Sequence, residues 1–175
     1  WLYHYLGKPH KSTALVHRIL NELYTDQPDG LCGNEDCGQM SSWYVLSSLG
    51  LYPVNPASPE YVLGAPLFAS AKMLAGGDTL LITADHPGKP YVQRVTFNGQ
   101  ELKRSWISHA ELAGGGTLAF KLGDAPNTQW GMEHRPASNL TKAYIPVPVI
   151  NMDRVYEDRV LVTISCPDPK AEIFV

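Results

Sequence analysis

The hydrophobic pattern of this chain changes its period at Pro53, and this change constrains the fold more than any other feature. Before Pro53, apolar residues recur at intervals of three and four, which is typical of amphipathic helices. After it, short runs rich in β-branched and aromatic residues lie between prolines and glycines, which is typical of strands. The pattern therefore predicts an α+β fold with a helical region over 1–52 and a β-rich region over 53–131.

Two helices are expected in the first region. The spacing of apolar residues predicts one helix from Ser12 to Tyr24, with Ser12 or Thr13 as the cap of its first turn. A second helix is expected over Gly38 to Leu49, where apolar side chains cover most of the circumference, so that it should be buried on several sides. Gly50 can adopt the left-handed conformation that ends such a helix.

The second region predicts a small antiparallel β unit over residues 60–131. Asn98-Gly99 is a strong hairpin signal, because both residues tolerate the positive φ that a two-residue turn requires. Three successive glycines from Gly114 mark another tight bend. The strands expected are Thr79 to Ala84, Tyr91 to Phe97, the return strand Gln100 to Arg104, and Thr117 to Leu122.

Residues 132–175 differ in composition from the regions before them. Residues 132–148 are polar, loosely patterned and contain three prolines, which is typical of a linker. Strands are expected at Val160 to Ser165 and Glu172 to Val175, as the start of a further β-sandwich module that the chain does not complete. Because the chain begins at Trp1 and stops inside an apolar run, we expect a fragment of a longer polypeptide.

Charge and hydropathy exclude several classes of function. Fourteen basic and seventeen acidic residues give a net charge of −3, and no run of Lys or Arg is present that could bind a phosphate backbone, so nucleic acid is not an expected partner. Every apolar stretch is shorter than a membrane span needs, and the first residues do not resemble a signal peptide.

The three cysteines leave the redox compartment open. Cys32, Cys37 and Cys166 cannot all pair within the chain, and their spacing does not match a four-ligand zinc site. Cys32 and Cys37 can form a disulfide or remain as two buried thiols, and the sequence does not decide between these alternatives.

The most informative stretch is the loop from Pro28 to Ser41, which holds three carboxylates and three glycines before an apolar helix. Glu35 and Asp36 stand at the expected start of that helix, where free N–H groups and the helix dipole stabilise negative charge. One interpretation is therefore helix capping by Asp36. The other is a functional site, because adjacent carboxylates repel each other unless one meets a cation, a donor or a substrate.

The residues of this loop also resemble a known family. Three stretches, Pro28 to Leu46, Gly50 to Val54 and Tyr61 to Gly64, are similar to the signature of glycoside hydrolase family 92, and weaker similarity extends the match over residues 1–131. The resemblance implies an inverting, calcium-dependent exo-α-mannosidase with an N-terminal β-sandwich and a C-terminal (α/α)6 helical toroid. The chain would hold the closing helices of the toroid (1–52), a β-rich closing segment (53–131), and a linker with a truncated β module (132–175), since residues 145–175 weakly resemble appended fibronectin-like modules.

The resemblance also implies roles for single residues. Asp36 falls where the family places its general base, and Asn34 falls at a position that is Asp in many relatives. Glu35, Asn34 and Gln39 are expected to contact the substrate. The general acid and the calcium ligands are expected upstream of Trp1, so we expect no metal site within the chain and no activity from the chain alone.

The same resemblance implies the partners and the location of the whole protein. Terminal α-linked mannose of N-glycans or mannan is the expected substrate, the rest of the parent polypeptide is the expected partner, and a secreted or periplasmic location is expected.

The alternative function is a non-catalytic carbohydrate-binding or structural β module in which Asp36 only caps a helix. Trp43 and Tyr44 can be read as a sugar-stacking platform, but their helical spacing favours packing in the core. The six histidines lack the spacing of metal ligands and are interpreted as structural or surface residues.

Overall fold

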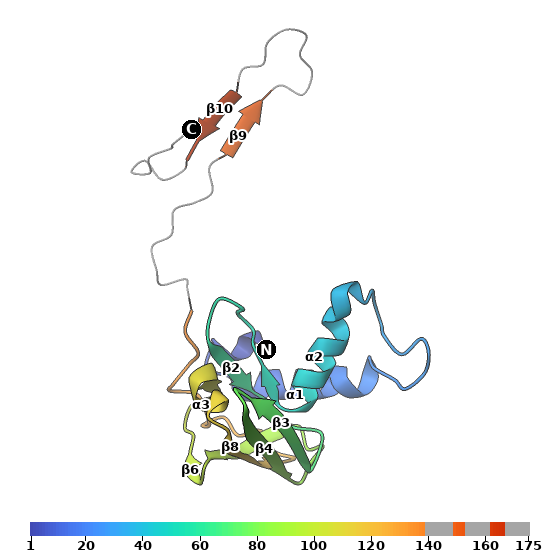
Figure 1. The fold of residues 1–175 in the computed structure, drawn as a ribbon, viewed down its shortest axis with the longest axis vertical. Helices are drawn as coiled ribbons and strands as arrows, with labels where there is room; N and C mark the ends of the chain where they lie inside the picture. Colours follow the sequence, from blue (N-terminus) through green and yellow to red (C-terminus); the bar gives the residue numbers. More distant parts are fainter. Residues whose placement is uncertain (139–148, 153–161, 167–175) are drawn as a thin grey trace. The chain divides into compact units, whose positions relative to one another are not determined.

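The computed structural model describes residues 1–138, 149–152 and 162–166 (Figure 1). The chain divides into two compact units, Trp1–Ala137 and Ser138–Val175. The expected division of the chain at residues 52 and 131 stays a prediction. Each unit is considered by itself below.

The first helical segment begins earlier than the apolar spacing predicts. A 3₁₀ turn, η1 (Leu2–His4), precedes helix α1 (Pro9–Glu22). Pro9 is the first helical residue, a position at which its missing N–H costs no hydrogen bond. The predicted cap by Ser12 or Thr13 is therefore wrong: both residues are buried inside α1, and the Thr13 hydroxyl donates to the carbonyl of His10.

The second helix, α2 (Gln39–Ser48), follows a 3₁₀ turn, η2 (Asp36–Gly38). Gly50 has φ of 76°, as the predicted left-handed stop requires. The expected burial of α2 on several sides is wrong, since against the described part of the chain only Ser47 and Ser48 are buried, and Val45 is 54% exposed. The buried residues of α2 lie in its last turn, Trp43 in its middle contacts Tyr52 of β1, and the residues before Trp43 are not buried.

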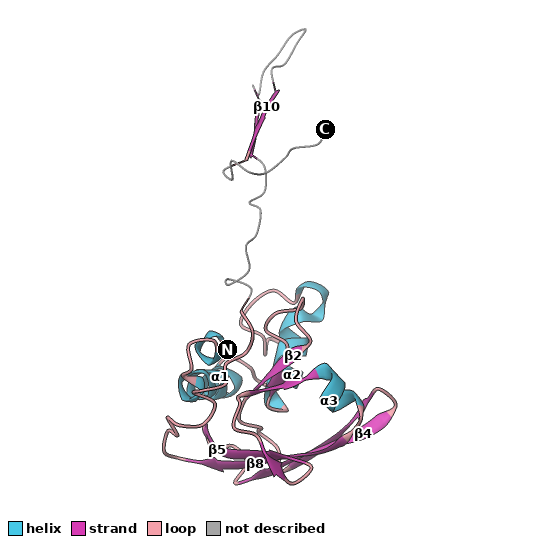
Figure 2. Ribbon diagram, turned by 90° about the vertical axis from the view of Figure 1, so that its left-hand side faces the viewer, coloured by secondary structure: helices cyan, strands magenta, loops and turns pink. Residues whose placement is uncertain are grey.

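The described strands of the first unit form two sheets (Figure 2). The smaller sheet has the order β1-β2-β7 and is antiparallel, and the larger sheet has the order β3-β4-β8-β5-β6. Figure 2 shows the larger sheet edge-on, with the helices and the smaller sheet on one side of it. The strands are β1 (Leu51–Tyr52), β2 (Glu60–Leu63), β3 (Ser70–Ala75), β4 (Asp78–Asp85), β5 (Tyr91–Phe97), β6 (Gln100–Glu101), β7 (Trp106–Ser108) and β8 (Gly116–Gly123).

The larger sheet is mixed, so the predicted all-antiparallel unit is wrong. After the β5–β6 hairpin the chain leaves this sheet through β7 and returns as β8 between β4 and β5. Strand β8 therefore runs parallel to β4 and antiparallel to β5. The hairpin itself is confirmed, with positive φ at both Asn98 and Gly99, although the return strand ends at Glu101 rather than Arg104.

One hydrophobic core holds the two sheets together. It draws on both sheets and on the short helix α3 (His109–Ala113), through Leu112. Its fully buried members include Leu51, Leu63, Leu80, Ile82, Val95, Ile107 and Leu118. The two sheets and α3 therefore share one continuous core.

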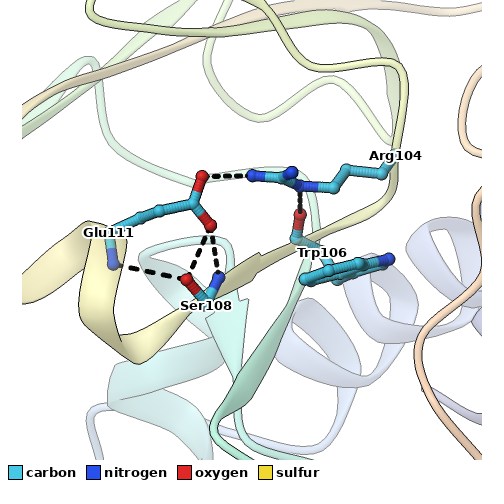
Figure 3. A network of polar contacts seen from close by, with 4 residues as sticks. All are labelled: Arg104, Trp106, Ser108 and Glu111. Carbon is cyan, nitrogen blue, oxygen red and sulfur yellow. Dashed lines mark hydrogen bonds and ion pairs between the residues drawn. The ribbon is translucent and has the colours of Figure 1, made fainter.

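Helix α3 was not expected from the sequence pattern, and a polar network defines its start (Figure 3). The Ser108 hydroxyl accepts the N–H of Glu111, while the Glu111 carboxylate accepts the N–H and hydroxyl of Ser108, which together form a capping box. Arg104 pairs with the same carboxylate and donates to the Trp106 carbonyl at 2.9 Å. Burial raises the pKa of Glu111, but the hydrogen bonds from Ser108 and the contact with Arg104 outweigh it and leave the pKa below its ordinary value.

In the second unit, β9 (Val149–Met152) pairs antiparallel with β10 (Val162–Ser165). The described part of the predicted strand at 160–165 is thus a strand. The predicted strand at 172–175 and most of the predicted linker over 132–148 lie outside the described residues.

Candidate active site

A loop of sixteen residues joins α1 to α2, and its first half is a closed turn. Tyr24 and Leu31 form an isolated antiparallel bridge, and Thr25 donates to the Gly30 carbonyl at 3.0 Å. A Cβ atom on Gly30 would lie 2.2 Å from the Thr25 carbonyl oxygen, so only glycine fits this turn. Because of this bridge, Leu31 lies beside Tyr24 near the end of α1, and Glu35 and Asp36 follow a few residues later.

Glu35 ties the second half of the loop to the start of α2. Its two carboxylate oxygens accept the backbone N–H of Ser41 at 3.1 and 3.2 Å. Ser41 lies in the first turn of α2, where N–H groups lack partners within the helix, and Gly38 at the N-cap has no side chain to supply one. Hydrogen bonds from Ser41 lower the pKa of the Glu35 carboxyl against a weaker effect of desolvation.

Asp36 is exposed, and its carboxylate has no hydrogen bond or ion pair with any described residue. Two successive residues after it have left-handed backbones, with φ of 55° at Cys37 and 74° at Gly38. A positive φ at a residue other than glycine is strained and is frequent at functional sites. The expected alternative in which Asp36 caps the helix is wrong in this structure, because Glu35 fills that role.

The other two predicted contact residues are Asn34 and Gln39, and both are exposed. Together with Glu35 and Asp36 they belong to one short segment that spans η2 and the first residue of α2. Cys32 precedes this segment and Cys37 lies within it, and both are free, exposed thiols. Neither of the two alternatives left open by the sequence, a disulfide or a pair of buried thiols, is what the structure shows.

Two hollows on the first unit could not be found from sequence patterns. One of about 380 Å³ is lined by residues that include Tyr24, Asp26, Ser41 and Tyr44. Tyr24 donates its hydroxyl to the Met40 carbonyl at 3.3 Å, and its ring lies 4.9 Å from that of Tyr44. The Tyr24 ring also stacks on Trp43 at 5.8 Å. Trp43 and Tyr44 thus pack on Tyr24, which favours packing over an open platform for sugar.

The second hollow is a groove of about 460 Å³ with a mainly apolar lining. Its residues come from the N-terminal turn and from one side of both helices, among them Trp1, Leu2, Leu15, Ile19 and Trp43. Leu2 and Leu15 are 72% and 46% exposed. Exposed leucines beside an apolar groove indicate a surface that another part of a protein covers.

The described residues do not fit a calcium site of their own. Among residues 1–138, 149–152 and 162–166, no three side chains of His, Cys, Asp or Glu lie close enough together to hold a metal ion. Of the histidines, His4 is fully buried beside the Trp1 ring, and burial lowers its pKa to about 3. Within the same described ranges, no helix has both the length and the apolar character needed to cross a membrane.

Comparison with known proteins identifies the family. The sequence model of the glycosyl hydrolase family 92 catalytic domain matches residues 1–124. The chain therefore belongs to glycosyl hydrolase family 92, and the resemblance carried by the loop signature is confirmed. An uncharacterized secreted glycosidase of Arthroderma benhamiae is 34% identical over 137 residues, which are 75% of this chain and 18% of that protein.

Solved structures of the family have the same fold over this segment. A family 92 α-mannosidase of Bacteroides thetaiotaomicron, also solved in complex with mannoimidazole, superimposes with a TM-score of 0.74 at 34% identity, covering 78% of this chain and 19% of that one. An inverting family 92 mannosidase of the same organism gives a TM-score of 0.73 at 38% identity, covering 80% and 20%. The chain thus spans about a fifth of the length of the relatives it matches.

Proposed function

We propose that this chain is the part of an inverting exo-α-mannosidase that supplies the general base, and that Asp36 is that base. The observation that carries the proposal is the free, exposed carboxylate of Asp36 on a strained turn whose neighbouring carboxylate is already engaged. Family membership supports the reaction class, and relatives described as α-mannosidases, one of them inverting, support the substrate and stereochemistry.

An inverting glycosidase needs two carboxyl groups about 6.5 to 9.5 Å apart, on opposite sides of the scissile bond. One protonates the leaving oxygen, and the other removes a proton from the attacking water. Asp36 has the second role: its Oδ atoms accept the proton while the water oxygen bonds to the anomeric carbon. Asn34 and Gln39 stand close to Asp36 in the chain, and their exposed amides contact the sugar or the water.

The general acid and the calcium ligands belong to parts of the catalytic domain that this chain does not contain. The coverage of the relatives supports this division, because the chain matches about a fifth of their length. In this arrangement α1 and α2 are closing helices of an (α/α)6 toroid, and β9 and β10 open a further β-sandwich module. The substrate is terminal α-linked mannose of N-glycans or mannan, and the fungal relative described as secreted supports a secreted or periplasmic enzyme.

The test is Asp36→Asn in the complete catalytic domain. Loss of a general base lowers kcat by about 100-fold to 10,000-fold, whereas the melting temperature should stay nearly unchanged because the side chain has no hydrogen bond or ion pair with the described residues. Asp29→Asn is the matched control, since Asp29 is an exposed carboxylate of the same loop. Retained turnover in Asp36→Asn contradicts the proposal, and a fall in melting temperature with turnover intact supports a structural role.

A further inference from the structure

The carboxylates of Glu35 and Asp36 are neighbours in sequence but differ in what they contact. Glu35 is bound through both oxygens to Ser41, and Asp36 is bound to none of the described residues. The direction of the Asp36 side chain therefore depends on the backbone that carries it. That backbone is the η2 turn, with Glu35 on one side and the left-handed Cys37 and Gly38 on the other.

The bond between Glu35 and Ser41 closes a ring of the chain around this turn. Five residues lie between the two partners, and Asp36 is the first of them. The Glu35 carboxylate folds back beside Gly38, where a Cβ atom would lie 3.8 Å from Glu35 Oε1. Because Ser41 is part of a regular helix, the bond ties the turn to a rigid element. A strained residue such as Cys37 keeps its conformation only when surrounding contacts hold it.

We propose that Glu35 is a positioning residue for the reaction, which holds Asp36 toward the attacking water through its bond to the α2 N-terminus. This replaces the expectation that Glu35 contacts the sugar, because its carboxylate faces the first turn of α2, where both oxygens lie within hydrogen-bond distance of the Ser41 N–H. The inference rests on the proposed function of Asp36. In this proposal the Glu35 carboxylate fixes the conformation of the loop, and the Asp36 carboxylate accepts the proton of the water.

The kinetic test compares Glu35→Ala and Glu35→Gln in the complete catalytic domain. A misplacement of about 1 Å costs up to about 100-fold in rate, so Glu35→Ala should lower kcat by about 10-fold to 100-fold while KM changes less than about threefold. The amide oxygen of Glu35→Gln can still accept the Ser41 N–H and should restore part of kcat. Glu22→Ala is the control: among the described residues this exposed glutamate pairs with Arg18 on α1 alone, so its loss should leave kcat and KM unchanged.

A second measurement does not depend on activity. In the NMR spectrum of the chain, the amide proton of Ser41 should shift as Glu35 is titrated, with a midpoint below the ordinary pKa of glutamate, and the shift should vanish in Glu35→Gln. A rise in KM with kcat unchanged in Glu35→Ala would overturn the inference and return Glu35 to sugar contact. So would a Ser41 amide that does not titrate. If Asp36→Asn keeps its activity while Ser41 titrates as expected, the fault lies with the proposed function instead.

Discussion

At the scale of single residues, the surroundings of an ionisable group decide its chemistry. Glu35 and Asp36 have carboxyl groups of similar intrinsic acidity, but hydrogen bonds from Ser41 lower the pKa of one, and the other meets no described partner. Because the folded pKa of Glu35 is depressed, its contribution to stability is present above the ordinary pKa of glutamate and is lost as pH falls through the lower, folded value.

His4 should make the folded chain sensitive to acid. Burial lowers its pKa to about 3, whereas the unfolded chain takes up the proton near the ordinary value of about 6.5. Between these two values the unfolded state binds more protons, so the free energy of unfolding should fall by about 1.4 kcal/mol for each unit that pH decreases. Urea unfolding at pH 7, 5.5 and 4.5 measures this slope.

In His4→Phe the free energy of unfolding should depend less steeply on pH over the same range, because the variant lacks the group that the unfolded state protonates. The exposed His134 provides the control, and His134→Phe should keep the slope of the parent chain. Equal slopes in the parent and His4→Phe would show that other groups cause the acid sensitivity.

The sequence singled out the residues of the candidate site, which stay a prediction, but it did not give their arrangement. The cluster Asn34, Glu35, Asp36 and Gln39 was found because it is local and matches a family signature. Glu35 rather than Asp36 caps the helix because its carboxylate reaches the N–H of Ser41, six residues after Glu35. This contact accompanies the positive φ at Cys37, which turns the chain between the two residues. Helix-start patterns allow an acidic residue at several positions, so they could not decide between the two.

At the scale of elements, β8 depends on a glycine at its first position. A Cβ atom on Gly116 would lie 2.4 Å from Oδ1 of Asn98, which accepts the N–H of Thr117 at 2.8 Å. The hairpin turn at Asn98 and the start of β8 are therefore joined by one side chain that has no room to move aside without losing this bond.

Gly116→Ala should consequently lower the free energy of unfolding more than Gly77→Ala does. Both glycines have positive φ, but nothing lies within 4 Å of a Cβ on Gly77, so that variant reports backbone strain alone, about 1 to 2 kcal/mol. Gly116→Ala should cost about 1 kcal/mol more, since it displaces a hydrogen bond. Thermal or urea unfolding of both variants measures the difference.

Combination with Asn98→Gly provides the check. The turn keeps a residue that tolerates positive φ, and the side chain that clashes with the new methyl group is gone. The extra cost of Gly116→Ala should then disappear. An extra cost that persists in the double variant would place its origin elsewhere in the backbone.

At the scale of the whole molecule, the apolar groove along η1, α1 and α2 is the surface that fits the proposed partner, the rest of the catalytic domain. The hydrophobic core lies between the sheets and supplies the stability of the first unit, whereas the groove is left open. A core for folding and an uncovered apolar face are the features expected of one segment of a larger catalytic domain.

The chain alone should therefore show no turnover of a mannobiose, and mixing it with the separately produced remainder of the catalytic domain should restore turnover. Leu2→Ser with Leu15→Ser should abolish this restoration while changing the free energy of unfolding of the chain by less than about 1 kcal/mol, because both side chains are exposed. Leu74→Ser on β3, a leucine that is 78% exposed and lies outside the groove, should restore activity as the parent does. Turnover by the chain alone would contradict the proposed division of the site.

Local information in the sequence was sufficient for the existence of helices α1 and α2, for strands β4, β5 and β8, for the Asn98-Gly99 hairpin and for the stop at Gly50, because each depends on neighbouring residues. Tertiary structure alone decided that β8 enters the larger sheet between β4 and β5, that α2 exposes its N-terminal half, and that Glu35 rather than Asp36 binds the helix. These features depend on groups distant in the chain or on the path of a strained turn, and hydrophobic period and local propensity contain no information about either.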